Sequence, residues 1–406
     1  MGHRGAQGLS ECECQSPPAR ERQAVVHDRY DAIVLGLGGM GSAAAAHIAL
    51  RGKRVLGLEQ FTPAHDRGSS HGASRIIRQA YFEDPAYVPL LLRAYELWQE
   101  LERTSDEPLY LRTGGLMVGR MDSALVQGSL RSAREHGLEH ELLSATDIAR
   151  RFPATAPRDN EVAVYEKPAG ILFPEACVRA YLKAAGAVGA DLRFETPVQK
   201  WQASDNGVDV TLTSGERVTG NSLVVCAGAW LPQMAAELAL PLRVERNVVH
   251  WFQPRSNPEL FTPDKLPVYI LDRGQRFMLY GFPDVEFAGI KAAFHHSEIF
   301  ASPEEMKRTV APDEVDAVRD ALAQWLPRGA GQHLASSVCM YTLTPDLHFV
   351  IGKHPAHANV IIAGGFSGHG FKFCSVVGET IADLVVEGES FNTIELFSPT
   401  RFGALT

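Results

Sequence analysis

The chain lacks both a long apolar run and a strongly basic run. Its 406 residues carry 39 Lys and Arg against 48 Asp and Glu, which gives a formal net charge of -9. No stretch approaches the roughly 20 apolar residues of a membrane span, and residues 1–29 mix acids, bases and prolines without the apolar core of a secretion signal. We expect residues 1–29 to be a disordered extension. These absences argue against nucleic acid and membrane partners and favour a cytoplasmic protein with a small ligand.

Cysteine is also scarce. The six cysteines are Cys12, Cys14, Cys177, Cys226, Cys339 and Cys374. They are too few for a disulfide scaffold, and the pair Cys12 and Cys14 has no second pair to complete a zinc site. We therefore expect reduced thiols and no metal centre. The length of the chain indicates two or three domains, and we expect two lobes.

The clearest motif follows an apolar run over residues 30–35. Glycines at Gly36, Gly38 and Gly41 form the pattern G-x-G-x-x-G, and the next apolar run ends at Glu59. Such glycines permit a sharp turn and a close approach of the backbone to a pyrophosphate, which then faces a helix N-terminus. The acid would accept hydrogen bonds from ribose hydroxyls. The pattern predicts a dinucleotide site, although it does not distinguish FAD from NAD.

Two further segments add to this site. Small residues over 68–74 lead to Arg75 and Arg78, which would project from one face if this segment is helical. Near the other end of the chain, the glycine-rich segment 364–372 lies between an apolar strand and an apolar helix that runs to Val386. A second helix N-terminus there would stabilise negative charge on a reduced flavin.

The rest of the chain alternates between helical and β-rich patterns. We expect helices over residues 87–102, 123–136, 145–151 and 174–185, a strand over 112–118, a β-rich segment over 243–289 that covers the substrate, and a helix after a capping box formed by Ser302 and Glu305. No repeat or low-complexity linker separates these segments. The two lobes must therefore be interleaved along the chain.

Four motifs together resemble those of the monomeric sarcosine oxidase and N-methyltryptophan oxidase family, which are FAD-dependent amine oxidases related to D-amino-acid oxidase. The motifs are residues 36–41, residues 70–78, the run Cys339-Met-Tyr-Thr-Leu-Thr-Pro-Asp and residues 364–372. The resemblance covers residues 30 to about 400. It implies an α/β fold in which a Rossmann-type FAD-binding domain (residues 30–84, 160–235 and 330–406) is interleaved with a substrate domain (residues 85–159 and 236–329) built on a mainly antiparallel sheet with helices.

The resemblance also implies which residues bind the cofactor. These are Gly36, Gly38, Gly41, Glu59, Ser69, Ser70, Arg75, Cys339, Gly368, Gly370 and Lys372. Cys339 matches the cysteine whose sulfur is bonded to the flavin, and forming that bond requires a thiolate in a basic neighbourhood. The alternative for Cys339 is a buried strand cysteine with a packing role only.

In the same way the resemblance assigns roles at the substrate. Arg78 and Lys372 match the pair that holds the substrate carboxylate, and Lys291 matches the lysine that activates oxygen. The other matches are Arg75 beside the flavin, His295, Tyr341 and His369 in the amine pocket, and Tyr81 and Tyr280 as substrate contacts. A snorkelling surface lysine is the alternative for Lys372, and an ordinary strand lysine for Lys291. Residues 271–277 depart from the family pattern, which leaves the size of the substrate open.

The activity implied by the resemblance is the oxidation of a secondary N-methyl amino acid such as sarcosine. The imine product hydrolyses to an amine and an aldehyde, and oxygen is reduced to hydrogen peroxide by a monomeric enzyme. The alternatives are a bulkier or cyclic substrate (N-methyltryptophan, pipecolate or proline), a dehydrogenase with another electron acceptor, and a flavin-binding sensor without turnover. A sensor has no need of two carboxylate-binding cations, so Arg78 and Lys372 argue against it.

Overall fold

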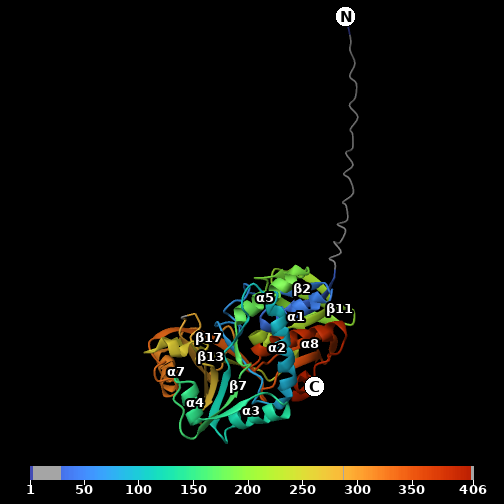
Figure 1. Ribbon diagram of the computed structural model, residues 1–406. Helices are drawn as coiled ribbons and strands as arrows, with labels where there is room; N and C mark the ends of the chain where they lie inside the picture. Colours follow the sequence, from blue (N-terminus) through green and yellow to red (C-terminus); the bar gives the residue numbers. More distant parts are fainter. Residues whose placement is uncertain (3–28, 287, 404–406) are drawn as a thin grey trace.

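The computed structural model describes residues 1–2, 29–286 and 288–403, so most of the expected N-terminal extension lies outside the described residues. Two parts are visible in Figure 1, one around helices α1, α5 and α8 and the other around α4, α7 and strand β13. Each part is organised by a large sheet. Both parts draw on segments that lie far apart in the sequence, as the colours of the ribbon show.

The first sheet is mixed and contains the predicted nucleotide-binding strands. Its order is β10 (Val198–Ser204), β11 (Gly207–Leu212), β12 (Arg217–Val225), β1 (Tyr30–Leu35), β2 (Val55–Leu58) and β9 (Asp191–Arg193), with β19 (His357–Gly364) paired to β12 and β18 (Val350–His354) to β19. The pairs of β1 with β2 and β12, of β2 with β9 and of β12 with β19 are parallel. Their carboxyl ends therefore meet at one edge, where an open α/β sheet binds its ligand.

The second sheet is almost entirely antiparallel. Its order is β17 (His333–Leu343), β13 (Arg243–Phe252), β16 (Ile290–His295), β15 (Met278–Phe282), β14 (Val268–Asp272), β5 (Gly115–Arg120), β7 (Glu161–Glu166) and β6 (Glu141–Ser144), and only β14 and β5 pair in parallel. A small antiparallel sheet consists of β3 (Arg75–Ile77), β8 (Gly170–Leu172) and β4 (Tyr110–Arg112).

Helices cover both large sheets. They are α1 (Gly39–Leu50), α2 (Val88–Glu102), α3 (Ala124–Glu135), α4 (Ala145–Arg151), α5 (Pro174–Ala187), α6 (Leu231–Met234), α7 (Pro312–Trp325) and α8 (Cys374–Val386). Short 3₁₀ segments span Pro85–Tyr87, Gly228–Trp230, Ala236–Leu238, Pro258–Phe261, Phe371–Phe373, Glu395–Phe397 and Pro399–Phe402. Helix α1 packs against α5 and α8, whereas α7 packs on β13, β15 and β16.

Small side chains bring the helices of the first part close together. The four alanines at residues 43–46 of α1 are fully buried. A Cβ on Gly378 of α8 would lie only 2.6 Å from the Cβ of Ala43. Because no side chain fits there, α8 lies directly on α1, and the N-termini of both helices approach the same region.

Most of the expected elements are confirmed. Helices form at residues 88–102, 124–135, 145–151 and 174–187, and the side chains of Ser123 and Ser144 cap the second and third of these. The β-rich segment from Arg243 is confirmed as strands β13, β14 and β15. The expected mixed α/β fold with a mainly antiparallel second sheet is also confirmed.

Three local expectations are wrong. Residues 112–118 are not one strand, because Thr113 and Gly114 separate β4 from β5 and the backbone of Gly114 has a φ of 74°. The segment from Arg75 forms strand β3 instead of a helix, since it pairs with β8. Side chains alternate along a strand, so residues three apart do not share a face.

The third wrong expectation is the helix after Ser302. The Ser302 hydroxyl does accept the Glu305 N–H at 3.3 Å, but helix α7 begins only at Pro312. The intervening backbone is held in a non-helical conformation, since the carbonyls of Lys307 and Thr309 accept hydrogen bonds from the Arg246 guanidinium. The capping signal depends on residues within the segment itself. The hydrogen bonds that prevent a helix there come from Arg246 on the distant strand β13.

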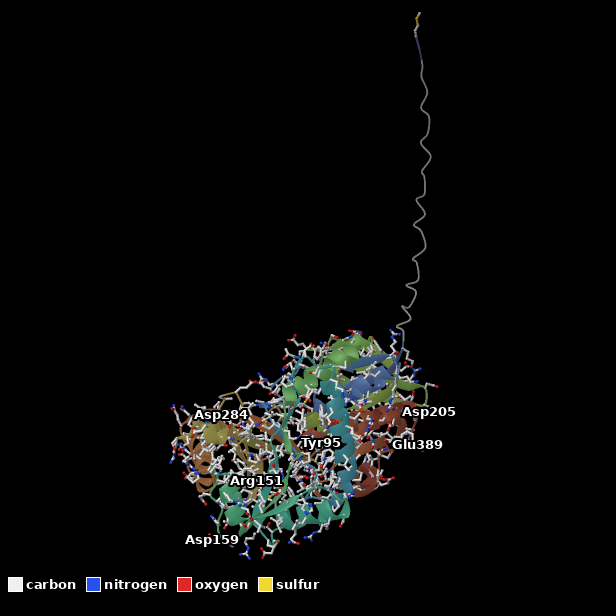
Figure 2. All side chains as sticks on the ribbon, viewed as in Figure 1. Tyr95, Arg151, Asp159, Asp205, Asp284 and Glu389 are labelled. Carbon is white, nitrogen blue, oxygen red and sulfur yellow. The ribbon has the colours of Figure 1, made fainter. Side chains whose placement is uncertain are left out.

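The surface carries the charged residues that the composition predicts. Asp159, Asp205 and Glu389 are exposed, whereas Tyr95 is buried in the interior (Figure 2). No helix in the described part of the chain is long and apolar enough to cross a membrane.

Candidate active site

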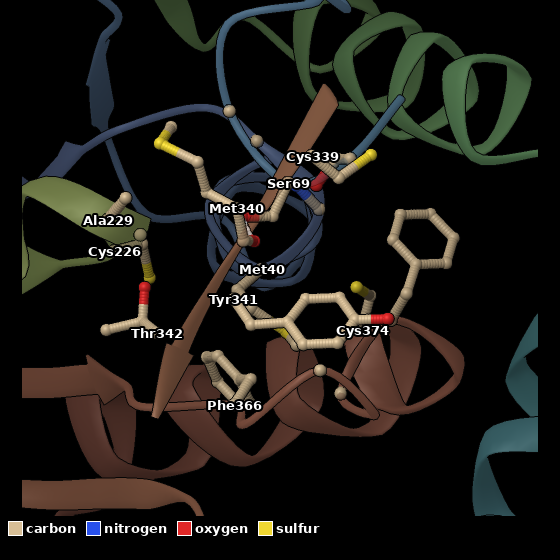
Figure 3. A pocket seen from close by; sticks show the side chains of 18 of the residues that line it. Met40, Ser69, Cys226, Ala229, Cys339, Met340, Tyr341, Thr342, Phe366 and Cys374 are labelled. Carbon is tan, nitrogen blue, oxygen red and sulfur yellow. Dashed lines mark hydrogen bonds between the residues drawn. The ribbon is translucent and has the colours of Figure 1, made fainter. Parts of the chain in front are cut away.

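A cavity of about 420 Å³ lies where the N-terminal motif, the middle of β17 and the C-terminal glycine-rich loop meet. Figure 3 shows Met40, Ser69, Cys339, Tyr341 and Cys374 around it. The predicted residues that line it are Gly36, Gly38, Glu59, Ser69, Ser70, Arg75, Arg78, Tyr280, His295, Cys339, Tyr341, Gly368, His369, Gly370 and Lys372. Gly41, Tyr81 and Lys291 lie just behind this lining. The fold thus brings together residues from both ends of the chain.

The turn into α1 requires glycine at residues 36 and 41. Gly36 has a φ of 84°, and a Cβ there would lie 2.5 Å from the carbonyl oxygen of Cys226. A Cβ on Gly41 would lie 1.7 Å from the carbonyl oxygen of Gly36. The side chain of Ser70 accepts the N–H of Gly39 at 3.1 Å. This tight turn leaves the start of α1 open to the cavity, which fits a dinucleotide pyrophosphate.

Glu59 closes strand β2 beside the same turn. One carboxylate oxygen accepts the N–H of Leu37 at 2.8 Å, and the other accepts the N–H of Phe61 at 3.0 Å. These contacts fix the carboxylate at the cavity wall and leave each oxygen with further acceptor capacity. The site therefore fits an adenosine ribose, as the sequence predicts.

Cys339 lies at the centre of β17 in a basic pocket. Its Sγ atom is 3.6 Å from Nη2 of Arg75 and 3.6 Å from Nε2 of His71. Burial opposes ionisation, but the Arg75 guanidinium, aided by His71, lowers the pKa of the Cys339 thiol to about 6. A thiolate at neutral pH is a nucleophile, so the surroundings of Cys339 suit covalent chemistry.

Arg75 is fixed in place by backbone carbonyls. Its guanidinium donates to the carbonyl oxygens of Ser74 and Ser69, both at 2.8 Å, and the hydroxyl of Ser69 donates to the carbonyl of Met340 at 2.6 Å. The loop before β3 is thereby tied to β17 next to Cys339. The sequence did not single out His71, although this residue stands within the matched motif.

Lys291 is a buried cation on β16, with only 2% of its surface exposed. Its ammonium group donates to the carbonyls of Gly72 and Ser74 at 2.6 and 2.9 Å and to the hydroxyl of Ser74 at 2.9 Å. Its Nζ atom lies 4.6 Å from the ring centre of Phe282. Burial, aided by the charge of Arg75, lowers the pKa of Lys291 well below its usual value.

Arg78 is almost fully buried and is paired with an acid that the sequence analysis missed. Its Nη2 atom donates to both carboxylate oxygens of Glu83 at 2.7 and 2.6 Å, and Nη1 donates to the carbonyl of Ala80 at 3.0 Å. The rings of Tyr81 and Phe82 lie 4.2 and 4.7 Å from the guanidinium carbon. Although burial opposes ionisation, Arg78 keeps the pKa of Glu83 below its usual value.

Lys372 is buried near the same tyrosine ring as Arg78, that of Tyr81. Its Nζ atom donates to the carbonyl of His369 at 2.7 Å and lies 5.2 Å from the ring centre of Tyr81. Burial, aided by the positive charge of Arg78, lowers the pKa of Lys372 to about 7. Lys372 is thus an interior lysine and not a snorkelling surface residue.

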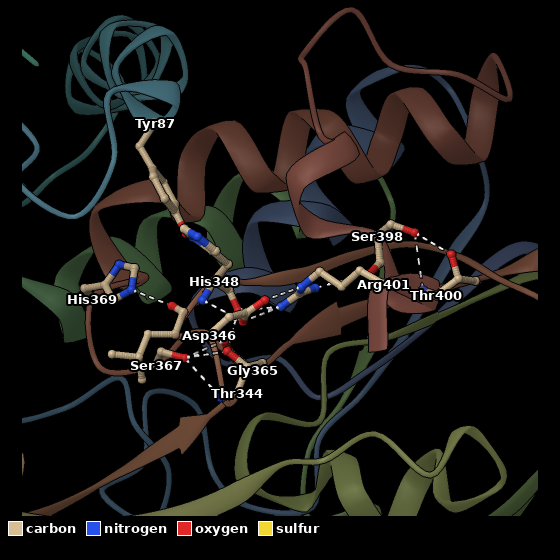
Figure 4. Close-up of polar contacts among 11 residues, drawn as sticks. Tyr87, Thr344, Asp346, His348, Gly365, Ser367, His369, Ser398, Thr400 and Arg401 are labelled. Carbon is tan, nitrogen blue, oxygen red and sulfur yellow. Dashed lines mark hydrogen bonds and ion pairs between the residues drawn. The ribbon is translucent and has the colours of Figure 1, made fainter. Parts of the chain in front are cut away.

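Polar contacts hold the loop that precedes Lys372, and Figure 4 shows those of Ser367 and His369 with the segment that follows β17. His369 shares a hydrogen bond of 2.5 Å with the Tyr81 hydroxyl and one of 3.0 Å with the carbonyl of Leu347. The hydroxyl of Ser367 accepts the N–H of Thr344 at 3.2 Å. Burial lowers the pKa of His369 to about 4, so this imidazole is neutral at pH 7.

Aromatic residues and a second neutral histidine complete the wall. The ring of His295 lies 5.8 Å from that of Tyr341 and 6.3 Å from that of Tyr280. Burial, aided by His296, lowers the pKa of His295 to about 3. A Cβ on Gly368 would lie 2.4 Å from the Tyr341 ring, so glycine is required there.

Comparisons with known proteins agree with this arrangement. Residues 31–384 match the family described as FAD dependent oxidoreductase. The chain is 50% identical over 378 residues to a monomeric sarcosine oxidase from Streptomyces avermitilis, which covers 92% of this chain and 98% of the relative. It is 35% identical over 378 residues to an N-methyl-L-tryptophan oxidase from Salmonella arizonae, and the aligned residues cover 92% of this chain and 99% of the relative.

Solved structures share the fold. NikD, an unusual amino acid oxidase essential for nikkomycin biosynthesis, has a TM-score of 0.81 at 23% identity and covers 92% of this chain and 98% of its own. Glycine oxidase from Geobacillus kaustophilus has a TM-score of 0.78 at 20% identity and covers 93% of this chain and 100% of its own. The family match, the identities and the tight glycine turn beside Glu59 agree, and the chain belongs to the FAD-dependent oxidoreductase family.

Proposed function

We propose that this oxidoreductase acts on a secondary N-methyl amino acid, of which sarcosine is the smallest. The observation that carries the proposal is the presence of two buried cations, Arg78 and Lys372, at one cavity. The relatives named above as sarcosine and N-methyltryptophan oxidases support the same substrate class.

A carboxylate is the ligand that suits these two cations. An arginine guanidinium can hold a carboxylate through two donors, which requires a rearrangement of its contact with Glu83, and Lys372 adds a point charge near the same ring, that of Tyr81. The substrate carboxylate would displace or share the place of Glu83 on Arg78. Tyr280, on β15, lines the cavity and would contact the rest of the substrate.

The surroundings of the substrate nitrogen favour a neutral amine. His295 and His369 line the cavity, and burial keeps both imidazoles uncharged at neutral pH. A neutral imidazole does not protonate an amine of higher pKa, and the His295 ring would accept an N–H hydrogen bond, whereas both ring nitrogens of His369 are already bonded to Tyr81 and Leu347. The Tyr341 hydroxyl, whose pKa is raised by burial, remains protonated as a donor.

FAD, when bound, accepts the hydride equivalent of the substrate and passes the electrons to oxygen, which leaves as hydrogen peroxide. The residues that would hold it are the glycines of the turn before α1, Glu59, Ser69 and Ser70, with Gly368 and Gly370 in the C-terminal loop. Arg75 supplies fixed positive charge in the loop over residues 72–75, and Lys291, which donates to two carbonyls of this loop, adds a second positive charge in its protonated form. A fixed cation stabilises the negative charge that develops on oxygen, which is the role we assign to Lys291.

We further propose that the cofactor is attached through Cys339. Attachment would join the sulfur to a methyl carbon of the flavin, and the two protons and two electrons released would reduce oxygen to hydrogen peroxide. The contacts of Arg75 and His71 with the sulfur support this assignment, because they stabilise the thiolate that must attack. Acid-precipitated protein should stay yellow, with the flavin mass on the peptide that contains Cys339.

The proposal also covers the domain organisation, the cellular location and the oligomeric state of the protein. We assign residues 30–84, 160–235 and 330–406 to the FAD-binding domain and residues 85–159 and 236–329 to the substrate domain; strands β7 and β17 lie within the first set of ranges but pair in the second sheet. The described cysteines Cys177, Cys226, Cys339 and Cys374 are free and buried, which supports a cytoplasmic location. The relatives from Streptomyces and Bacillus are named monomeric sarcosine oxidases, which supports a monomer.

The test is a substrate panel with purified holoenzyme, read by peroxide release and by anaerobic bleaching of the flavin. Sarcosine should give the highest kcat/KM, with less activity on N-methyl-L-tryptophan, pipecolate and proline. Bleaching without peroxide release would identify a dehydrogenase that uses another acceptor. A preference for one of the bulky amines would replace sarcosine as the substrate and leave the carboxylate site unchanged.

A further inference from the structure

The segment over residues 79–83 connects β3 to the 3₁₀ turn before α2, and its backbone is held by a buried acid. Glu166, the last residue of β7, has 1% of its surface exposed. Its Oε1 atom accepts the N–H of Gln79 at 2.9 Å and the N–H of Ala80 at 2.5 Å. Two backbone donors thus converge on one carboxylate oxygen immediately after Arg78.

Helix α3 holds the next two residues of the same segment. The hydroxyl of Ser132 donates to the carbonyl oxygen of Tyr81 at 2.5 Å. A Cβ on Gly128 would lie 2.3 Å from the carbonyl oxygen of Phe82, so α3 can lie this close only because residue 128 is glycine. The segment is therefore fixed at successive residues by β7 and α3.

We propose that Glu166 is a positioning residue for binding of the substrate carboxylate, an inference that rests on the proposed function. Arg78 is oriented by two contacts within the segment, one with the Ala80 carbonyl and one with Glu83. Both partners move if the segment moves. Because Glu166 holds the N–H of Ala80 itself, it determines where the Arg78 guanidinium lies.

The chemistry of Glu166 fits this role better than a general contribution to stability. A buried carboxylate that accepts two N–H groups is an acceptor with no donor of its own, so the segment can dock in one orientation only. Although these contacts and Arg78 act against it, burial raises the pKa of Glu166. Burial of the Glu166 carboxylate destabilises the folded protein, yet this acid is retained next to the arginine that would bind the substrate.

The same strand offers a matched control. Glu161, the first residue of β7, is also buried and is paired with Arg273 at 2.6 and 3.0 Å. Neither residue lines the cavity. Glu161→Gln therefore removes a buried charge from β7 without touching the segment that follows Arg78.

The experiment measures acetate binding to the holoenzyme by flavin absorbance, together with kcat and KM for sarcosine. Glu166→Leu should raise the acetate Kd and the sarcosine KM by about tenfold or more, while kcat at saturation stays within about twofold. Glu166→Gln retains an acceptor oxygen and should give a smaller rise. Hydrogen exchange of the peptide that contains residues 79–83 should quicken in Glu166→Leu, and Glu161→Gln should leave that peptide, the acetate Kd and the KM unchanged.

The opposite results would overturn the proposal. A lower Tm in Glu166→Leu with an unchanged acetate Kd would make Glu166 structural only, as would an equal loss of acetate binding in Glu161→Gln. If Glu166→Leu does not fold, Ser132→Ala supplies the test, because loss of its hydrogen bond to Tyr81 should also weaken acetate binding, and an unchanged Kd would refute the idea. Wild-type holoenzyme that neither binds acetate nor oxidises sarcosine would instead refute the proposed function.

Discussion

Replacing Glu83 by glutamine should tighten the binding of simple carboxylates, because Glu83 occupies the guanidinium that the substrate needs. The side chain of Arg78 is 2% exposed and that of Glu83 is 17% exposed, so this ion pair is largely shielded from water. Hydrogen bonds to a charged group contribute about 1.5–3 kcal/mol each. Glu83→Gln keeps one acceptor and loses the other contact and the charge, so a gain of about 1.4 kcal/mol, or about tenfold in the acetate Kd, is expected.

Stability should change in the opposite direction. Glu83→Gln leaves the Arg78 charge buried without a carboxylate, which destabilises the folded protein. The assay is a titration of the holoenzyme with acetate followed by flavin absorbance, with thermal unfolding measured on the same sample. Added acetate should restore more of the lost Tm in the variant than it adds to the wild type, because it binds only the folded state.

The outcome separates three arrangements of the site. An unchanged acetate Kd would mean that Arg78 does not release Glu83 when a carboxylate binds, and the reasoning above would be refuted. A weaker Kd would mean that Glu83 itself supports the ligand. Tighter acetate binding with a higher KM for sarcosine would show that Glu83 also contacts the amine, because acetate lacks that group.

Three further predictions concern the other cations and the thiol. Because the pKa of Lys372 is lowered to about 7, its charge is present below that pH and lost above it; the acetate Kd should rise about tenfold per pH unit above pH 7, and Lys372→Met should abolish this dependence. Lys291→Met should slow reoxidation of the flavin by oxygen at least about tenfold more than its reduction by sarcosine in rapid-mixing experiments; equal slowing would contradict the oxygen role. Cys339→Ala should release all its flavin into the supernatant on acid precipitation, and flavin that stays with the protein pellet would place the attachment elsewhere.

Local patterns were sufficient to predict much of the fold. The spacing of apolar residues predicted three helices to within one or two residues, because this signal lies within each helix. The glycine pattern before α1 predicted a tight turn. The prediction succeeded because the clash that enforces glycine at Gly41 is with Gly36, five residues away.

What the sequence did not reveal depends on contacts between distant segments. Strand β3 forms because residues 170–172 lie alongside it, and α7 starts late because Arg246 holds the preceding backbone. Glu83 and Glu166 are two acids among 48 acidic residues. No periodic or motif signal distinguishes them, since their importance arises only when the folded chain places both next to Arg78.

The partners of the buried cations indicate how binding energy is divided at the site. Arg78 already holds the carboxylate of Glu83, so exchanging it for a substrate carboxylate replaces one ion pair by another, and loss of the first offsets part of the free energy gained from the second. Among the described residues no carboxylate lies within ion-pair distance of Lys372, which donates to a backbone carbonyl instead. A substrate carboxylate would give Lys372 its anion and raise its lowered pKa. In the proposed function Lys372 therefore gains an ion pair on binding, whereas Arg78, fixed through Ala80 and Glu166, exchanges one ion pair for another and sets the orientation of the substrate.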